Sequence, residues 1–78
     1  MIRVSVIFHL TLARYSPNGA RSEVIELAPG HDLGALLGQL GIPPTLGAVV
    51  LVNGRRAGSG VILQDQDRVD LMLPLTGG

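Results

Sequence analysis

Apolar and polar residues alternate over the first ten positions of the chain. The even positions carry apolar side chains: Ile2, Val4, Val6, Phe8 and Leu10. A repeat of two residues is typical of a strand with one buried face, so we predict a first strand whose even positions face the core. Ile7, at an odd position, is then expected on the outer face.

A second strand is predicted over residues 22–27, antiparallel to the first. The segment Ser16-Pro17-Asn18-Gly19 between the two is a turn signal, because proline fixes φ and Asn-Gly tolerates a left-handed backbone. Within the second strand, Ile25 and Leu27 are expected to point inward.

The spacing of apolar residues then becomes helical. Leucines recur at i, i+3, i+4 and i+7, at positions Leu33, Leu36, Leu37 and Leu40. This spacing places one apolar stripe on a helix, so we predict a helix over 33–40. Asp32 suits the amino-terminal cap, and Gly41 followed by Pro43-Pro44 suits the end of the helix.

The second half of the chain predicts three further strands. A continuous apolar run over 48–52 indicates a strand covered on both faces. Asn53-Gly54 is a strong hairpin signal, and a short return strand is expected over 55–57. After a turn at 64–67, a final alternating strand places Met72 on the outer face. The residues of that strand expected to point inward are Val69, Leu71 and Leu73.

The predicted order is strand, strand, helix, strand, strand, strand. A single helix with one apolar stripe must cover one face of the sheet, and only the connection that contains it is long enough to join parallel strands. These features indicate an α+β fold of the β-grasp (ubiquitin-like) class, a mixed sheet of about five strands with one main helix packed on one face. We expect residues 1–73 to form this domain and residues 74–78 to form a flexible C-terminal Gly-Gly tail.

Composition narrows the possible functions. The chain has 78 residues, six arginines balanced by six acidic residues, and neither lysine nor cysteine. Zero net charge argues against a nucleic-acid partner, and without cysteine the chain has no thiolate for catalysis or for an iron–sulfur cluster. No apolar segment is long enough for a signal peptide or a membrane span, so we expect a cytoplasmic protein that binds no membrane.

Histidine and acidic residues form no recognisable catalytic or metal-binding set. His9 and His31 are far apart in the sequence, and Asp65 and Asp67 lack the further carboxylates of a calcium loop. We interpret the acidic pair as turn chemistry and predict neither a metal nor a cofactor.

The C-terminal pair Gly77-Gly78 has a chemical interpretation of its own. Diglycine is the least bulky dipeptide and adopts any backbone conformation, so it fits a narrow channel and can present the carboxylate of Gly78 to another protein's active site. A carboxylate transfers its acyl group only after activation, for example by ATP to an acyl-adenylate, which implies a partner enzyme with a nucleotide site. The alternative is that the pair is a frayed end.

Ile7 and Met72 are expected on the same outer face, on adjacent strands beside the apolar 48–52 run. Apolar side chains gathered on an exposed face are typical of a partner surface. Arginines at the rim of this surface would add polar contacts, and the sequence does not choose among Arg14, Arg55, Arg56 and Arg68.

Several short segments together resemble the ThiS/MoaD family of ubiquitin-like sulfur carriers over essentially the whole chain. They are Met1-Ile2-Arg3-Val4 followed by Phe8 and Arg14, Val52-Asn53-Gly54, Leu63-Gln64-Asp65-Gln66-Asp67-Arg68-Val69, and Pro74-Leu75-Thr76-Gly77-Gly78. The chain departs from the family at Gln66, where the family usually has glycine. Pro74 makes the tail more similar to that of the small subunit of molybdopterin synthase than to that of the thiamine-pathway carrier.

The resemblance implies a carrier rather than an enzyme. An E1-like adenylyltransferase (MoeB/ThiF-like) would adenylate Gly78, which follows Gly77, and a sulfur donor such as a cysteine desulfurase or rhodanese would convert it to a thiocarboxylate. A synthase large subunit (MoaE-like) would be a further partner. The residues expected to contact these partners are Ile7, Met72, Pro74, Leu75 and Thr76.

Other functions stay open at this point. A ubiquitin-like modifier would use the same activation but would join Gly78 to lysines of other proteins. A noncatalytic β-grasp interaction subunit would have no use for the tail. Sulfur delivery to the thiamine pathway, or to another pathway, is an alternative to molybdopterin.

Overall fold

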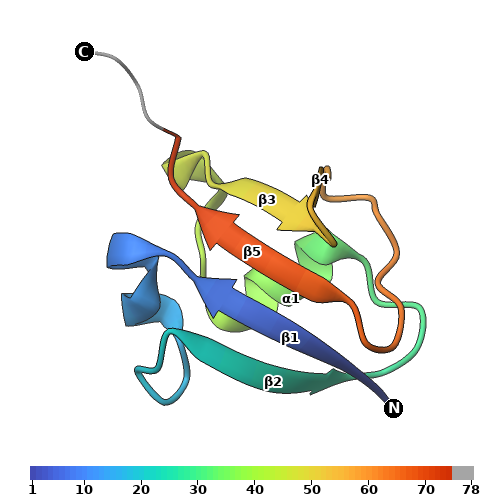
Figure 1. Ribbon diagram of the computed structural model, residues 1–78. Helices are drawn as coiled ribbons and strands as arrows, with labels where there is room; N and C mark the ends of the chain where they lie inside the picture. Colours follow the sequence, from blue (N-terminus) through green and yellow to red (C-terminus); the bar gives the residue numbers. More distant parts are fainter. Residues whose placement is uncertain (75–78) are drawn as a thin grey trace.

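The sheet begins with a hairpin of two long strands. The computed structural model describes residues 1–74 and contains β1 at Ile2–Phe8 and β2 at Ser22–Leu27. The two strands pair antiparallel from Ile2 opposite Leu27 to Ile7 opposite Ser22 (Figure 1). Alternate residues of β1 and β2 are buried, as the two-residue repeat predicts.

Helix α1 (Leu33–Leu40) has the predicted bounds. Asp32 caps its amino end by accepting a hydrogen bond from the N–H of Ala35 at 2.8 Å, which satisfies one of the unpaired donors of the first turn. Gly41 ends the helix with a φ of 76°, a left-handed conformation that glycine adopts without steric cost. No helix within residues 1–74 is long and apolar enough to cross a membrane.

Three shorter strands complete a five-stranded sheet. They are β3 (Val49–Val52), β4 (Arg55–Arg56) and β5 (Arg68–Met72). The strand order is β2-β1-β5-β3-β4, with β1 and β5 paired parallel at the centre and the other neighbours antiparallel. The connection through α1 joins β2 to β3, which lie on opposite sides of this central pair. The two parallel strands that pair at the centre, β1 and β5, are the first and the last strands of the chain.

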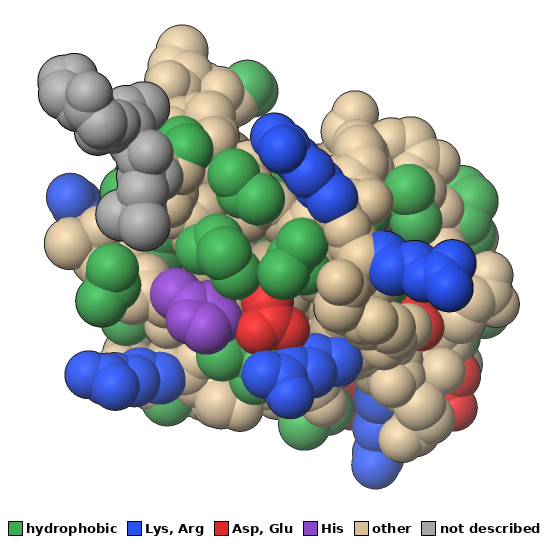
Figure 2. All heavy atoms as spheres, turned by 45° about the horizontal axis from the view of Figure 1, so that its top comes forward, with side chains coloured by type: hydrophobic (Ala, Val, Ile, Leu, Met, Phe, Trp, Pro, Cys, Tyr) green, Lys and Arg blue, Asp and Glu red, His purple; other side chains and the backbone are tan. Residues whose placement is uncertain are grey.

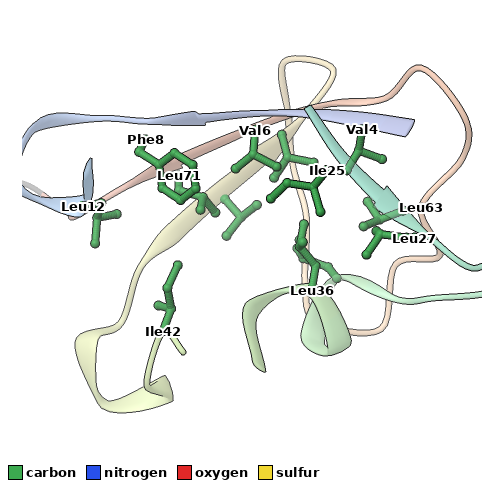
Figure 3. Packing of buried hydrophobic residues seen from close by; sticks show 13 residues of the cluster. Val4, Val6, Phe8, Leu12, Ile25, Leu27, Leu36, Ile42, Leu63 and Leu71 are labelled. Atoms are coloured by element: carbon green, nitrogen blue, oxygen red, sulfur yellow. The ribbon is translucent and has the colours of Figure 1, made fainter. Parts of the chain in front are cut away.

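One apolar core lies between the sheet and α1. Figure 3 shows side chains of β1, β2 and β5 packed toward those of the helix and the neighbouring loops. The core residues with no exposed surface are Val4, Val6, Phe8, Leu36, Val69 and Leu71. In Figure 1, α1 covers one face of the sheet and leaves the other open. The predicted α+β, β-grasp architecture is confirmed.

Two leucines that we expected in the core are exposed instead. Leu10 has 82% of its surface exposed and a φ of 50°, because β1 ends two residues earlier and the chain turns into a 3₁₀ helix, η1 (Leu10–Tyr15). Leu12, within that helix, is buried. Leu73 is 39% exposed, because β5 ends one residue before it. Both predictions were wrong because the alternation was extended beyond the ends of the strands.

β3 faces the core on one side only. Val50 is buried, whereas Val49 and Leu51 are half-buried. Within residues 1–74, no second layer covers the face of the sheet to which Val49 and Leu51 belong. The prediction that this strand is covered on both faces is therefore wrong, and the sheet has one open face.

Candidate functional site

The open face of the sheet carries a group of apolar side chains. Four half-buried residues on three neighbouring strands form this open-face patch: Ile7 of β1, Met72 of β5, and Val49 and Leu51 of β3. Val49 lies directly opposite Met72 across the β3–β5 pair. Figure 2 shows hydrophobic side chains gathered on this face. Ile7 and Met72 thus lie on the outer face and on adjacent strands, as expected, and their role in binding stays a prediction.

One row of residues crosses the open face from strand to strand. Ile7 lies opposite Asp70, Asp70 lies opposite Leu51, and Leu51 lies opposite Arg56. Neighbouring strands are about 4.8 Å apart, so the backbone of Arg56 is roughly 10 Å from that of Asp70 and directly beside that of Leu51. The row therefore places a carboxylate inside the patch and a guanidinium at its edge.

The carboxylate of Asp70 is buried and ionised. Asp70 is 8% exposed and accepts two hydrogen bonds from Arg68, from Nε to Oδ1 at 2.9 Å and from Nη2 to Oδ2 at 3.2 Å. Nε2 of His9 lies 3.0 Å from the same Oδ2. Burial acts to raise the pKa of Asp70, but the hydrogen bonds from Arg68 and His9 outweigh burial and hold that pKa below its ordinary value. The negative charge of Asp70 is compensated within the sheet.

Within residues 1–74, most acidic side chains accept hydrogen bonds from their own chain, whereas most arginines form no ion pair. Within residues 1–74, five of the six acidic side chains accept hydrogen bonds from their own chain: Glu23, Asp32, Asp65, Asp67 and Asp70. Over the same residues Arg68 is the one arginine in an ion pair, and Arg14 lies over the ring of Tyr15 at 5.6 Å. Figure 2 shows arginine side chains around the apolar group. Asp70, the acidic residue inside the patch, is paired with Arg68, so the unpaired charge beside the apolar group is that of arginine side chains.

The chain leaves the domain beside the open-face patch. β5 ends at Met72, which is itself a patch residue, and Leu73 and Pro74 follow with exposed side chains. The other residues predicted to form the site lie outside the described residues: Leu75, Thr76, Gly77 and Gly78. A protein bound to the patch is therefore next to the start of the predicted tail.

The opposite side of the molecule has a hollow of a different kind. A pocket of about 320 Å³ lies between α1 and the segment that follows it, with Leu37, Ile42 and Pro43 among its lining residues. Its lining contains one hydroxyl group, that of Ser59, and no titratable side chain. Within residues 1–74, no three histidine, aspartate or glutamate side chains are placed to hold a metal ion.

Two features of the open face could not be predicted from residue patterns. His9 and Asp70 are 61 positions apart, and their contact depends on the parallel pairing of β1 with β5. Strand pairing also places Arg56 beside the patch, whereas the ion pair of Arg68 with Asp70 joins residues two positions apart on β5.

The turn before β5 confirms the interpretation of the acidic pair. Asp67 accepts hydrogen bonds from the N–H of Gln64 and from Nδ2 of Asn53, both at 2.8 Å. Gln66, where the resembling family usually has glycine, adopts a φ of 71°. Gln66 thus adopts the left-handed backbone conformation that favours glycine, although it is not a glycine.

Comparisons with known proteins agree with this fold. A chain of the putative molybdopterin converting factor subunit 1 from Pyrococcus furiosus is 20% identical, with a TM-score of 0.79 over 96% of this chain and 100% of that one. Small archaeal modifier protein 1 from Haloferax volcanii is 21% identical, with a TM-score of 0.78 over 96% and 100% of the two chains. In the complex of subunits 1 and 2 of the molybdopterin-converting factor from Helicobacter pylori, one chain is 24% identical, with a TM-score of 0.64 over 99% and 100%.

Sequence comparison identifies the family. A search of curated proteins found no match. The family model described as the ThiS family matches residues 12–78, which is most of the chain and includes α1 and four of the five strands. This protein belongs to the ThiS family.

Proposed function

We propose that this protein is a sulfur carrier whose Gly78 carboxyl group is activated by another enzyme. The observation that carries the proposal is the match to the ThiS family, whose members are small carrier proteins rather than enzymes, over a range that includes Gly77-Gly78. In this proposal residues 1–73 are the domain that a partner recognises, and residues 74–78 are the segment on which the chemistry takes place.

Sulfur enters at Gly78 in two steps. The carboxylate first attacks ATP, which forms an acyl-adenylate and releases pyrophosphate. A sulfur nucleophile then attacks the acyl carbon and displaces AMP, which carries away one of the carboxylate oxygens. With a persulfide donor, such as a cysteine desulfurase or rhodanese, a thiol must then reduce the S–S bond to release the thiocarboxylate. An E1-like adenylyltransferase of the MoeB/ThiF type supplies the nucleotide site, and we place the reaction in the cytoplasm.

The open-face patch supports the proposal because it supplies a docking surface beside the tail. Ile7 and Met72 contact the activating enzyme in this proposal, and the tail extends from that contact into the enzyme's active site. Five extended residues, Pro74, Leu75, Thr76, Gly77 and Gly78, span at most about 17 Å. This reach is enough to separate the bound domain from the reacting carbonyl, and the glycines allow a narrow channel between them.

Molybdopterin biosynthesis is the pathway that we favour as the destination of the sulfur. Two structures with the same fold are named for the molybdopterin converting factor, and one of them is a complex of its two subunits. Pro74 agrees with this choice, as noted from the sequence. A MoaE-like large subunit would then receive the thiocarboxylate tail. Sulfur delivery in the thiamine pathway is the alternative.

A second candidate function is that of a ubiquitin-like modifier. The likeness to small archaeal modifier protein 1 favours it, because a modifier and a carrier share the activation step and differ in the nucleophile. An amine of a target lysine would replace sulfur. Covalent adducts that persist on a denaturing gel of a cell lysate and disappear when Gly78 is deleted would support this function.

Adenylation at Gly78 tests the activation step that both candidate functions share. The full chain is mixed with the activating enzyme from the same organism and ATP, and the return of labelled pyrophosphate into ATP is measured. We expect exchange with the wild-type chain and none when Gly78 is deleted. Exchange that survives this deletion would contradict the proposal. Function that survives removal of Gly77-Gly78 would indicate an interaction subunit instead.

A further inference from the structure

Arg56 lies at the edge of the open-face patch without an ion-pair partner of its own. It is exposed and lies opposite Leu51 on the neighbouring strand. Within residues 1–74, the one ion pair between an arginine and a carboxylate is that of Arg68 with Asp70, and Nε2 of His9 lies 3.0 Å from Oδ2 of Asp70. The negative charge of Asp70, inside the row, is thus compensated by Arg68. The positive charge of Arg56, at the end of the row, has no such partner among these residues.

A partner that covers Leu51 also removes water from Arg56. The two backbones are neighbours in the sheet, about 4.8 Å apart, so a surface packed on the leucine side chain lies within reach of the guanidinium. Burying an unpaired charge is strongly unfavourable. A carboxylate on the partner offsets this cost, because guanidinium and carboxylate groups form two parallel hydrogen bonds.

We infer that the open-face patch binds a partner surface that is apolar at its centre and carries an aspartate or glutamate side chain opposite Arg56. The inference rests on the proposed function, since it takes the activating enzyme as the protein that covers the patch. The arginines around the open-face patch (Figure 2) agree with an acidic partner, because complementary charge both steers encounter and fixes orientation.

Arg55 offers a matched control on the same short strand. It lies opposite Val52, which packs against the core, and successive residues of a strand point to opposite faces. Arg55 therefore points away from the patch. Arg55→Glu and Arg56→Glu change the net charge equally and at nearly the same place, so general attraction or repulsion affects both variants alike. A direct contact affects only Arg56→Glu.

Binding is measured by isothermal titration of the wild-type chain and each variant into the activating enzyme, without ATP. We expect Arg56→Glu to raise the Kd at least about tenfold and Arg55→Glu to raise it by less than about threefold. Arg56→Gln should show a smaller loss than Arg56→Glu, and the loss for Arg56→Glu should shrink as salt is added. Both arginines are exposed, so thermal unfolding should be unchanged in all variants.

Two results would overturn the inference. One is an equal change in Kd for Arg55→Glu and Arg56→Glu, which would indicate general electrostatics without a contact. The other is an unchanged Kd for Arg56→Glu together with loss of self-association in sedimentation, which would make a second copy of the chain the occupant of this face.

Adding ATP to the same mixtures separates this inference from the proposed function. A wild-type chain that binds but gives no pyrophosphate exchange would contradict activation at Gly78, and a difference between the variants in Kd would still support the Arg56 contact. Pyrophosphate exchange by the wild-type chain would support the proposed function. If Arg55→Glu and Arg56→Glu then had the same Kd as each other, the Arg56 contact would be contradicted.

Discussion

The two faces of the sheet differ in how completely their apolar residues are covered. On the helix side, Phe8 and Leu71 have no exposed surface and pack in one core with Leu36. On the open side, Ile7 and Met72 are only half-buried, and charged groups lie among them. Folding therefore uses one face of the sheet, and the other face keeps apolar surface that the isolated domain does not need.

Successive residues of β1 point to opposite faces of the sheet, so single substitutions can separate effects on stability from effects on binding. A domain of this size has one small core and a correspondingly narrow margin of stability. Changes on the helix side should act on unfolding, and changes on the open side should act on the partner. The predictions below follow this comparison from the largest expected effect to the smallest.

Phe8→Ala should have the largest effect on stability. The side chain is completely buried, and its removal leaves a cavity that costs about 3–5 kcal/mol of unfolding free energy. Urea denaturation followed by circular dichroism measures the change. A loss below about 1 kcal/mol would show that the helix side is not the stabilising face.

Ile7→Ala should have a small effect on stability and a large effect on binding. Because its side chain is half-buried on the open face, we expect a loss of unfolding free energy of about 1 kcal/mol or less. Pyrophosphate exchange at a subsaturating concentration of the chain should fall about tenfold, since a central apolar contact to the partner is lost. Unchanged exchange would mean that the patch is not the docking surface.

Asp70→Asn should lower stability at neutral pH by about 1 kcal/mol, because the exposed guanidinium of Arg68 loses its carboxylate partner. The folded-state pKa of Asp70 lies below its unfolded value. Its stabilising contribution is therefore complete above the ordinary pKa of aspartate, about 3.9, and is lost as pH falls through the lower folded-state value.

Thermal unfolding of wild type and Asp70→Asn is followed from neutral pH to below the ordinary pKa of aspartate. The difference in stability between the two proteins is compared at each pH. The other carboxylates are the same in both proteins, so their contributions cancel in the difference between the two. The stability gap should narrow as the pH is lowered. A gap that stays constant with pH would contradict the ion pair.

Gln66→Gly should give the smallest change, and it should be stabilising. The left-handed φ of 71° costs an ordinary residue about 1 kcal/mol, but glycine is also freer in the unfolded chain, so the net gain is about 0.5 kcal/mol. This turn sets the register of β5 against β1, because the N–H of Gln66 donates to the carbonyl of Arg3 at 2.7 Å. Lower thermal stability would show that the hydrogen bond from Nε2 of Gln66 to Oδ2 of Asp65, at 3.4 Å, matters more than backbone strain.

Local patterns predicted the helix and most strands because the responsible signals are local. The leucine spacing and Asp32 cap predicted the bounds of α1, alternation predicted the first strand, and the turn signal at 16–19 separated it from the second. Alternation failed at Leu10 and Leu73, since nothing in a repeat of two residues marks where a strand ends.

The candidate site was less predictable because it depends on strand order. The contact of His9 with Asp70 and the position of Arg56 beside Leu51 require pairings that no short segment specifies. The run over 48–52 was interpreted as a strand with two covered faces. It has apolar residues on both faces, and we propose that a partner rather than a second helix covers the outer one.

The central claim is that sulfur is carried on the carboxyl group of Gly78, and intact-mass spectrometry tests it most directly. The full chain is incubated with ATP, the activating enzyme and a sulfur donor with a reducing thiol, and the mass of the product is compared with that of a chain lacking Gly78. We predict a gain equal to the exchange of one oxygen for one sulfur in the full chain and no gain in the shortened one. An unchanged mass after adenylation has been verified would contradict the sulfur-carrier account.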